Sequence, residues 1–209
     1  RRAAEKNLIL QVGFIERFNP AVAALDKVIH HPLFIESHRL HPFIERGTDV
    51  DVVLDLMIHD LDLILHYVNS TLRNVEAVGV SVLSDKVDIA NVRLTFENGC
   101  VANITASRVT LKHMQKLRFF GVEGYHSVDF SKRELISLKR EHKEGGKIEI
   151  ALNEVQVTQY DPLEEEIRGF IECVMERTEP RVSGAEARKS LELALLINEQ
   201  MKTGRDVAL

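Results

Sequence analysis

Apolar positions recur with helical spacing near both ends of the chain, and local sequence signals mark where the helices begin. Asn19 and Pro20 are typical of a helix start, because Asn caps free backbone amides and Pro suits the first helical position. A capping box over residues 183–186 precedes the last apolar repeat. The sequence therefore predicts helices over four segments: 19–29, 51–67, 162–177 and 184–201.

Between Arg73 and about Val157 the helical spacing gives way to short runs rich in Val, Ile, Thr and Phe. Turn residues separate these runs, and Asn98-Gly99 between two apolar stretches is the clearest hairpin turn. The pattern predicts six strands and a weaker seventh in an antiparallel meander: 73–83, 87–96, 100–108, 114–121, 124–130, 133–140 and 147–157.

Two strands are also expected before this run. Residues 8–13 form an apolar stretch typical of a buried strand, which follows the end of a helix in residues 1–7. Residues 33–40 alternate between apolar and polar side chains, as in a half-buried strand. Helices, then strands, then helices are typical of an α+β fold, in which helices cover one face of a largely antiparallel, open-faced sheet.

The most informative segment is residues 51–69, an apolar helix that also carries acidic and histidine side chains. At about 100° per residue, five of them fall within one stripe roughly 80° wide. They are Asp51, Asp55, His59, Asp62 and His66. Val, Leu, Ile and Met form nearly all the remaining surface, with Asp60 as the polar exception. The stripe contains no Lys, Glu or Arg, which favours a functional site over the alternative of an ordinary solvated face.

Composition and charge argue against several classes of protein. The chain has 209 residues, of which 44% are hydrophobic and 28% charged, as in ordinary globular proteins. The net charge of −5 and the lack of a Lys/Arg run argue against a nucleic-acid surface. No apolar segment reaches the ~18 residues that span a bilayer. Cys100 and Cys173 show neither metal-ligand nor disulfide spacing, which favours a reducing, cytoplasmic setting.

Five motifs follow one another along nearly the whole chain. They are VGFIERFNP (12–20), DLMIHDLD (55–62), DIANVRLTFENGCVANITASR (88–108), LRFFGVEGY (117–125) and SGAEARKSLELAL (183–195). Together they resemble the Gfo/Idh/MocA family of NAD(P)-dependent sugar and cyclitol dehydrogenases. In that family an N-terminal Rossmann domain binds the dinucleotide, and a C-terminal α+β domain with an open sheet binds the substrate and mediates oligomerisation.

The chain departs from the family pattern in its nucleotide-binding motifs. It has no G-x-G-x-x-G after a strand, and no Glu-Lys-Pro motif with the family's catalytic Lys. The resemblance therefore implies that residues 1–16 are a remnant of the N-terminal dinucleotide-binding domain, namely its last helix and strand. Residues 17–209 are expected to form the C-terminal substrate-binding and oligomerisation domain. We expect NAD or NADP in the full-length parent and no cofactor bound to this chain alone.

Asp55 and His59 match the family's Asp-x-x-x-His motif. Neutral imidazole has a pKa near the working pH, so His59 suits the role of the base that takes the hydroxyl proton during hydride transfer. Asp55, four residues earlier, can orient the ring or bind a neighbouring hydroxyl. The alternative for His59 is a core histidine bonded to a carbonyl.

Five further residues are candidate substrate ligands: Arg17, Asn19, Arg39, Asp62 and Arg108. Arg17 and Asn19 follow the expected strand at 8–13, at the carboxyl edge where α/β proteins bind ligands. Arg39 and Arg108 each end a strand and are expected to line the same cavity. Alternatively, Asn19 only caps its helix, and Arg39 and Arg108 form surface ion pairs.

The expected function is that of the substrate-binding half of an NAD(P)-dependent oxidoreductase. Its substrate would be a secondary alcohol or ketone of a sugar, cyclitol or nucleotide sugar, and the chain alone is expected to be inactive. One alternative is a non-catalytic oligomerisation or ligand-binding module. Another is a metal-binding hydrolase that combines the stripe with His30, His31, His38 and His41. No His-Glu-x-x-His pattern supports that alternative, and we assign no metal ligand.

The predicted helices can cover only one face of the sheet. Several strands carry apolar residues on both alternating sets, such as Leu135 beside Ile136 and Leu138. An exposed apolar face of this size would exceed what a soluble monomer usually tolerates. We therefore expect a homo-oligomer, a dimer or tetramer, that pairs through the open sheet face.

Overall fold

One eight-stranded sheet organises the described part of the chain, residues 2–44, 49–143 and 146–203 of a computed structural model. The strands are Phe34–Leu40 (β1), Leu72–Val80 (β2), Ile89–Phe96 (β3), Val101–Ser107 (β4), Met114–Phe120 (β5), Gly124–Asp129 (β6), Glu134–His142 (β7) and Ile148–Leu152 (β8). All seven strands predicted after Arg73 are present, with bounds shifted by a few residues.

Strand β1 lies inside the sheet although it comes first in the sequence. The spatial order is β2-β3-β4-β1-β5-β6-β7-β8. Strand β1 runs parallel to β4 and antiparallel to β5, and the other neighbouring pairs of this sheet are antiparallel. The expected largely antiparallel, open-faced sheet is confirmed, but β1 divides the expected meander into two parts.

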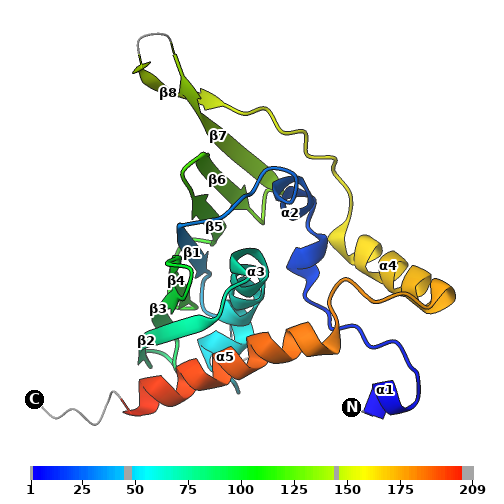
Figure 1. Ribbon diagram of the computed structural model, residues 1–209. Coiled ribbons are helices and arrows are strands. Elements are labelled where there is room, and N and C mark those ends of the chain that lie inside the picture. Colours follow the sequence, from blue (N-terminus) through cyan, green and yellow to red (C-terminus); the bar gives the residue numbers. More distant parts are fainter. Residues whose placement is uncertain (1, 45–48, 144–145, 204–209) are drawn as a thin grey trace, which may run out of the picture.

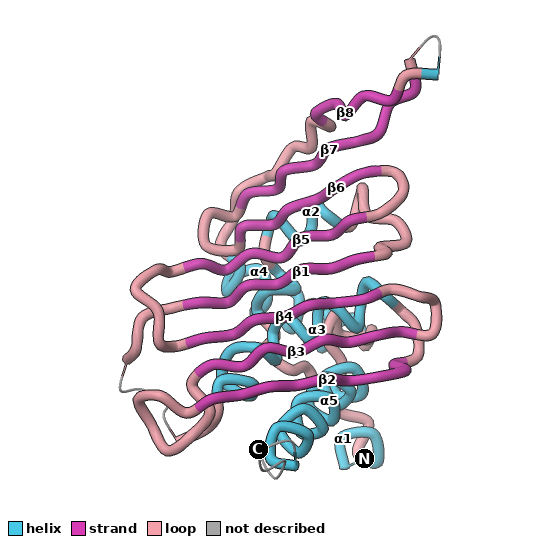
Figure 2. The backbone as a smooth tube through the Cα atoms, turned by 90° about the vertical axis from the view of Figure 1, so that its left-hand side faces the viewer, coloured by secondary structure: helices cyan, strands magenta, loops and turns pink. Residues whose placement is uncertain are grey.

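The helices lie on one face of the sheet, as Figure 2 shows with the opposite face toward the viewer. They are Arg2–Glu5 (α1), Pro20–Leu25 (α2), Ile58–Val68 (α3), Pro162–Glu176 (α4) and Gly184–Thr203 (α5), with a 3-10 turn Ile15–Phe18 (η1) and a π turn Val53–Met57 (η2). Helix α5 contacts both α3 and β2, whereas α2 contacts β6 and β7. Helix α4 lies farther from the sheet and contacts η1 (Figure 1).

The hydrophobic core lies between the sheet and α3. Alternate residues of β3 face the helices, and Val92 and Leu94 are fully buried there. From α3, Leu61 and Ile64 are equally buried and belong to the same cluster. Burial of these apolar side chains is the main favourable contribution to the packing of the two layers.

Two expected elements differ from the structure. The helix predicted over 19–29 ends at Leu25. The strand predicted over 8–13 is an extended segment with one bridge, between Gln11 and Ser183, and Leu8 and Leu10 remain 58% and 50% exposed. A strand needs a neighbouring ladder to bury its apolar side chains, and the described part of this chain provides a single bridge at that place.

The open face of the sheet is more polar than the strand pattern predicted. On β3 the outward positions Asn91 and Arg93 alternate with buried apolar ones. One apolar row nevertheless crosses six strands in register: Val101, Phe34, Phe120, Tyr125, Leu138 and Leu152. Its aromatic rings contact one another, with centroids 5.6 Å apart for Phe34–Phe120 and 4.9 Å apart for Phe120–Tyr125. We call these six residues the apolar row.

Candidate active site around His59

The long apolar helix begins with Asp51, which acts as its cap. The Asp51 Oδ1 atom accepts hydrogen bonds from the backbone amides of Val53 at 2.9 Å and Leu54 at 3.1 Å. Its Oδ2 atom accepts a hydrogen bond from Asn198 Nδ2 at 2.7 Å, which ties the helix start to α5. Asp51 therefore stabilises the free amides of a helix N-terminus.

A π turn over Val53–Met57 separates this cap from α3. A π turn holds more residues per turn than an α-helix, so the even 100° spacing behind the predicted stripe does not extend across it. Asp55 lies within this turn and is half-buried. His59, Asp62 and His66 follow in regular α3. Such π turns occur frequently at functional sites.

His59 lies in the first turn of α3, where its imidazole ring is half-buried. The Phe14 ring meets it edge-on, with centroids 5.8 Å apart and planes at 82°. Its Nδ1 atom is buried and has no hydrogen-bond partner among the described residues. Burial lowers the pKa of the imidazole below its ordinary value, and the positive charge of Arg39 lowers it further. Both effects favour the neutral ring that a general base needs.

Arg39 joins β1 to α3 and η1 through a buried ion-pair network. Its Nε and Nη2 atoms donate to the two carboxylate oxygens of Asp60 at 2.9 and 3.0 Å. Its Nη1 atom donates to Glu16 Oε1 at 3.0 Å. Burial opposes the charge on Arg39, but Asp60 and Glu16 outweigh that effect and keep the pKa of the guanidinium above its usual value.

Arg17 pairs with Asp62 on the next turn of α3. The Arg17 Nε atom lies 2.6 Å from Asp62 Oδ2, and both side chains are almost fully buried. Ser190 Oγ of α5 donates to Asp62 Oδ1 at 3.3 Å. Beside this pair lies a cavity of about 110 Å³. Its lining includes Arg17, Asp62, His66, Glu186, Lys189 and Ser190.

Asn19 is also fully engaged within the protein. Its Oδ1 atom accepts a hydrogen bond from the Ala21 amide at 3.0 Å, as the cap of α2. Its Nδ2 atom donates to Glu16 Oε2 and to the Phe130 carbonyl, each at 3.2 Å. This is the capping role that the sequence offered as the alternative to substrate binding.

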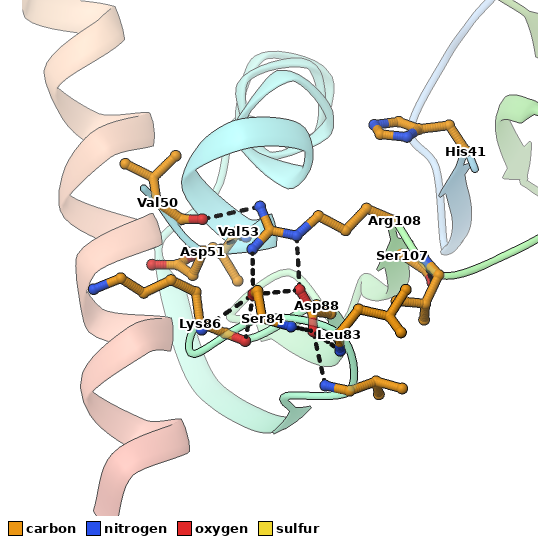
Figure 3. A network of polar contacts seen from close by, with 12 residues as sticks. His41, Val50, Asp51, Val53, Leu83, Ser84, Lys86, Asp88, Ser107 and Arg108 are labelled. Carbon is orange, nitrogen blue, oxygen red and sulfur yellow. Dashed lines mark hydrogen bonds and ion pairs between the residues drawn. The ribbon is translucent and has the colours of Figure 1, made fainter. Parts of the chain in front are cut away.

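Arg108 belongs to a different network (Figure 3). Its guanidinium donates to Asp88 Oδ1 at 2.9 Å, to the Val50 carbonyl at 3.0 Å and to Ser84 Oγ at 3.1 Å. The Arg108 side chain is 1% exposed and that of Asp88 is 0% exposed. The ion pair expected as the alternative for Arg108 is therefore present, but it is buried rather than on the surface.

The structure brings His59, Arg39 and Asp62 together and adds two residues that the sequence analysis did not select, Asp60 and Glu16. The position of Asp60 in the sequence could have identified it as part of the site. A carboxylate on the apolar side of a buried helix requires a cationic partner, because an unpaired buried charge is very costly. Glu16 gave no comparable signal, because it lies in a short 3-10 turn rather than on the apolar side of a long helix.

The alternatives of a metal site and a membrane span can be compared with the described residues. Within residues 2–44, 49–143 and 146–203, no group of three or more His, Cys, Asp or Glu side chains is placed to hold a metal ion. The helices in these ranges are also too short or too polar to cross a membrane.

The family follows from the sequence match. Residues 30–127 match the model of the GFO/IDH/MocA C-terminal domain. This chain carries a GFO/IDH/MocA C-terminal domain. The matched segment includes β1 with Arg39, and α3 with His59 and Asp60, so the network lies within this domain.

Two curated relatives of this chain are named as dehydrogenases. The chain is 35% identical over 200 residues to UDP-N-acetylglucosamine 3-dehydrogenase of Acidithiobacillus ferrooxidans, which covers 93% of this chain and 63% of that protein. It is 23% identical over 227 residues to scyllo-inositol 2-dehydrogenase (NAD(+)) of Bacillus subtilis, which covers 100% of this chain and 65% of that protein.

Solved structures agree with this fold. A structure of UDP-N-acetylglucosamine 3-dehydrogenase from Acidithiobacillus ferrooxidans superposes with a TM-score of 0.86 at 34% identity, covering 96% of this chain and 64% of that one. Levoglucosan dehydrogenase in complex with NADH and L-sorbose shares the fold, with a TM-score of 0.77 at 17% identity over 94% of this chain and 65% of that one. This chain thus spans less than two thirds of the length of each relative named here.

Proposed function

We propose that the whole protein is an NAD(P)-dependent dehydrogenase acting on a secondary alcohol or ketone of a nucleotide sugar, sugar or cyclitol. In this proposal the present chain supplies the substrate-binding half. The observation that carries it is the 35% identity to a UDP-N-acetylglucosamine 3-dehydrogenase across 93% of this chain. The inositol dehydrogenase, at 23% identity, supports the same class of reaction with a different alcohol.

In this proposal His59 is the acid–base residue. Oxidation of a carbinol to a ketone removes a hydride from carbon and a proton from the hydroxyl group. When bound, the nicotinamide ring supplies the hydride acceptor. The half-buried, neutral imidazole of His59 takes the proton, because its lowered pKa leaves the ring unprotonated near neutral pH. In ketone reduction the protonated ring returns that proton.

The roles of the other predicted site residues are also proposed. Asp55 lies in the π turn that precedes His59 and is half-buried, so it remains a candidate for orienting the imidazole or binding a hydroxyl group. Arg17 and Asp62 line the 110 Å³ cavity, where they can meet the polar part of a substrate. Asn19, Arg39 and Arg108 are held by internal hydrogen bonds, and we assign them supporting roles.

The residues of this chain do not fit a pyrophosphate-binding loop, because it has no G-x-G-x-x-G motif after a strand. We therefore propose that a separate N-terminal domain of the whole protein holds NAD(P), with residues 1–16 as its last part and 17–209 as the substrate domain. An uncovered apolar face of α4 supports this division. Leu163, Ile167 and Ile171 are spaced four residues apart on α4 and are 54%, 53% and 51% exposed. A neighbouring domain would cover such a face.

We further propose that the protein is a homo-oligomer, a dimer or tetramer, that pairs through the open sheet face. The apolar row supports this, since it runs across the uncovered face from β4 to β8. Within this row Leu152 is 63% exposed. The polar side chains of β3 and β4 beside the row can form the polar part of such an interface.

A cofactor-reduction assay tests the proposed function. The whole protein is incubated with NAD⁺ or NADP⁺ and, separately, with UDP-N-acetylglucosamine, scyllo-inositol or myo-inositol, and absorbance of the reduced nicotinamide is followed. We expect reduction of the nicotinamide cofactor with at least one combination of cofactor and substrate. Mass spectrometry should then identify the ketone product. Failure of every pair, together with failure of the reverse reaction on the corresponding ketones, would favour the non-catalytic binding module.

A further inference from the structure

We propose that Arg39 is a positioning residue for His59. Through one buried ion-pair network with Asp60 and Glu16, it fixes both elements that flank the imidazole and favours the neutral ring. The catalytic meaning of this role rests on the proposed function, whereas the effect on His59 itself does not. From its place at the end of a strand, Arg39 was expected instead to be a direct ligand of the substrate.

The guanidinium of Arg39 uses three nitrogen atoms on two carboxylates. Two nitrogens form a forked contact with Asp60 at 2.9 and 3.0 Å, and the third contacts Glu16 at 3.0 Å. The side chains of Arg39, Asp60 and Glu16 are 4%, 1% and 12% exposed. The Arg39 guanidinium carbon also lies 5.0 Å from the centre of the Phe130 ring. All three guanidinium nitrogens of Arg39 therefore contact buried or nearly buried carboxylates, and the side chain has almost no exposed surface for a substrate to contact.

The same contacts hold the surroundings of His59. Asp60 is the next residue on α3, so the forked contact fixes the helix turn that carries the imidazole. Glu16 lies two residues after Phe14, whose ring meets the imidazole edge-on at 5.8 Å. A single Arg side chain on β1 therefore connects the helix beneath His59 with the segment that packs against its ring.

The charges around His59 explain why the neutral ring is favoured. Arg39 approaches from β1, Glu16 from η1, and Asp60 and Asp62 from α3 itself. Burial lowers the pKa of His59 and Arg39 lowers it further, while the three carboxylates raise it. Protonation would also place an N–H on the buried Nδ1 atom, which has no acceptor among the described residues. Without Arg39, the carboxylates of Asp60 and Glu16 would lose the cation that balances them.

This proposal predicts opposite shifts for two variants. Arg39→Gln removes the cation and leaves two carboxylates, so the pKa of His59 should rise, by on the order of one pH unit. Asp60→Asn removes a carboxylate and leaves Arg39, so the pKa of His59 should fall. A residue that only stabilised the fold would not move the pKa in opposite directions in these two variants.

The test is an NMR titration of the histidine side chains in this chain, without cofactor. Arg108→Gln is the matched control, because Arg108 is equally buried but pairs with Asp88, and it should leave the pKa of His59 unchanged. If Arg39→Gln does not fold, the proposal is tested by Asp60→Asn and Arg39→Lys. The lysine variant keeps the positive charge, so the pKa of His59 should stay lowered. An unchanged pKa in folded Arg39→Gln, or a raised one in Asp60→Asn, overturns the proposal.

This titration is separate from the test of the proposed function. The expected shifts together with an inactive whole protein would overturn the dehydrogenase assignment but leave the role of Arg39 intact. An active whole protein in which Arg39→Gln leaves the pKa of His59 unchanged would overturn the role of Arg39 alone.

Discussion

The Asp88–Arg108 pair gives the sharpest test of how buried charges hold this domain together. Asp88 Oδ2 accepts the backbone amides of Val82, Leu83 and Ser84 at 2.7, 2.6 and 2.9 Å. Its Oδ1 atom accepts hydrogen bonds from Ser84 Oγ at 2.7 Å and from Arg108 Nε at 2.9 Å. These contacts fix the loop between β2 and β3 against the end of β4 (Figure 3).

Two substitutions remove this pair, Asp88→Asn and Arg108→Met. Asp88→Asn should lower the free energy of unfolding more. The Asn amide group has one oxygen, which can take the place of Oδ2, but its NH₂ group would then face the donating Nε of Arg108. This leaves the Arg108 charge buried without its counterion, which typically costs ~3–5 kcal/mol. Arg108→Met leaves Asp88 with four of its five hydrogen-bond donors. The loss in free energy of unfolding should therefore lie near the lower end of that range, at about 3 kcal/mol.

Urea unfolding followed by circular dichroism measures these differences. With a slope of about 2–3 kcal/mol per M, the loss of ~3–5 kcal/mol in Asp88→Asn should lower the unfolding midpoint by roughly 1–2.5 M at an unchanged slope. Arg188→Met is the control, because Arg188 is exposed on α5 and donates to Glu192 at 2.7 Å. It should cost about 0.5 kcal/mol or less. An unfolding midpoint of Asp88→Asn as close to that of the original chain as the midpoint of Arg188→Met would refute the reasoning.

Three further outcomes are expected. Sedimentation at micromolar concentration should show a species larger than the 23.7 kDa chain. The double variant Tyr125→Asp, Leu138→Asp should dissociate this species into single chains. A 23.7 kDa species before substitution would contradict pairing through the open sheet face. Calorimetry of this chain with NADH should show no micromolar binding, and a clear isotherm would refute the proposed domain division. Burial alone would raise the pKa of Asp88, but hydrogen bonds from Ser84, Val82, Leu83 and Arg108 hold it well below its usual range. The stability this contributes is present above about pH 4 and is lost as the pH falls toward that lowered pKa, so acid should destabilise the original chain more steeply than Asp88→Asn.

Local pattern was sufficient for most of the fold. The hairpin at Asn98-Gly99 follows from turn chemistry, and Gly99 has the positive φ of 86° that such a turn needs. The position of β1 between β4 and β5 could not be predicted in this way. It depends on pairing between segments more than 60 residues apart, such as Phe34 with Val101. Alternation of side chains shows which face of a strand is buried, but not which strand lies beside it.

The site was predicted less completely, because its charges are paired over long distances in the sequence. Arg17, Arg39 and Arg108 were expected to meet a substrate, yet their carboxylate partners Asp62, Asp60 and Asp88 lie 45, 21 and 20 residues away. Their ion pairs form only when η1, β1 and β4 pack against their neighbours. The π turn before α3 could not be predicted from the sequence either. One additional residue in a turn changes which side chains share a helix face, but it leaves the composition of the segment unchanged.

The most direct test of the account is the pH profile of turnover in the whole protein with and without His59. His59→Asn should lower kcat by about 10²–10⁴-fold and remove the low-pH limb of the profile, as expected for loss of an acid–base group. His113→Asn is the control, because His113 is exposed in the loop before β5 and should leave both kcat and the pH profile unchanged. Near-normal turnover in a well-folded His59→Asn protein, with an unchanged pH profile, would contradict the central claim.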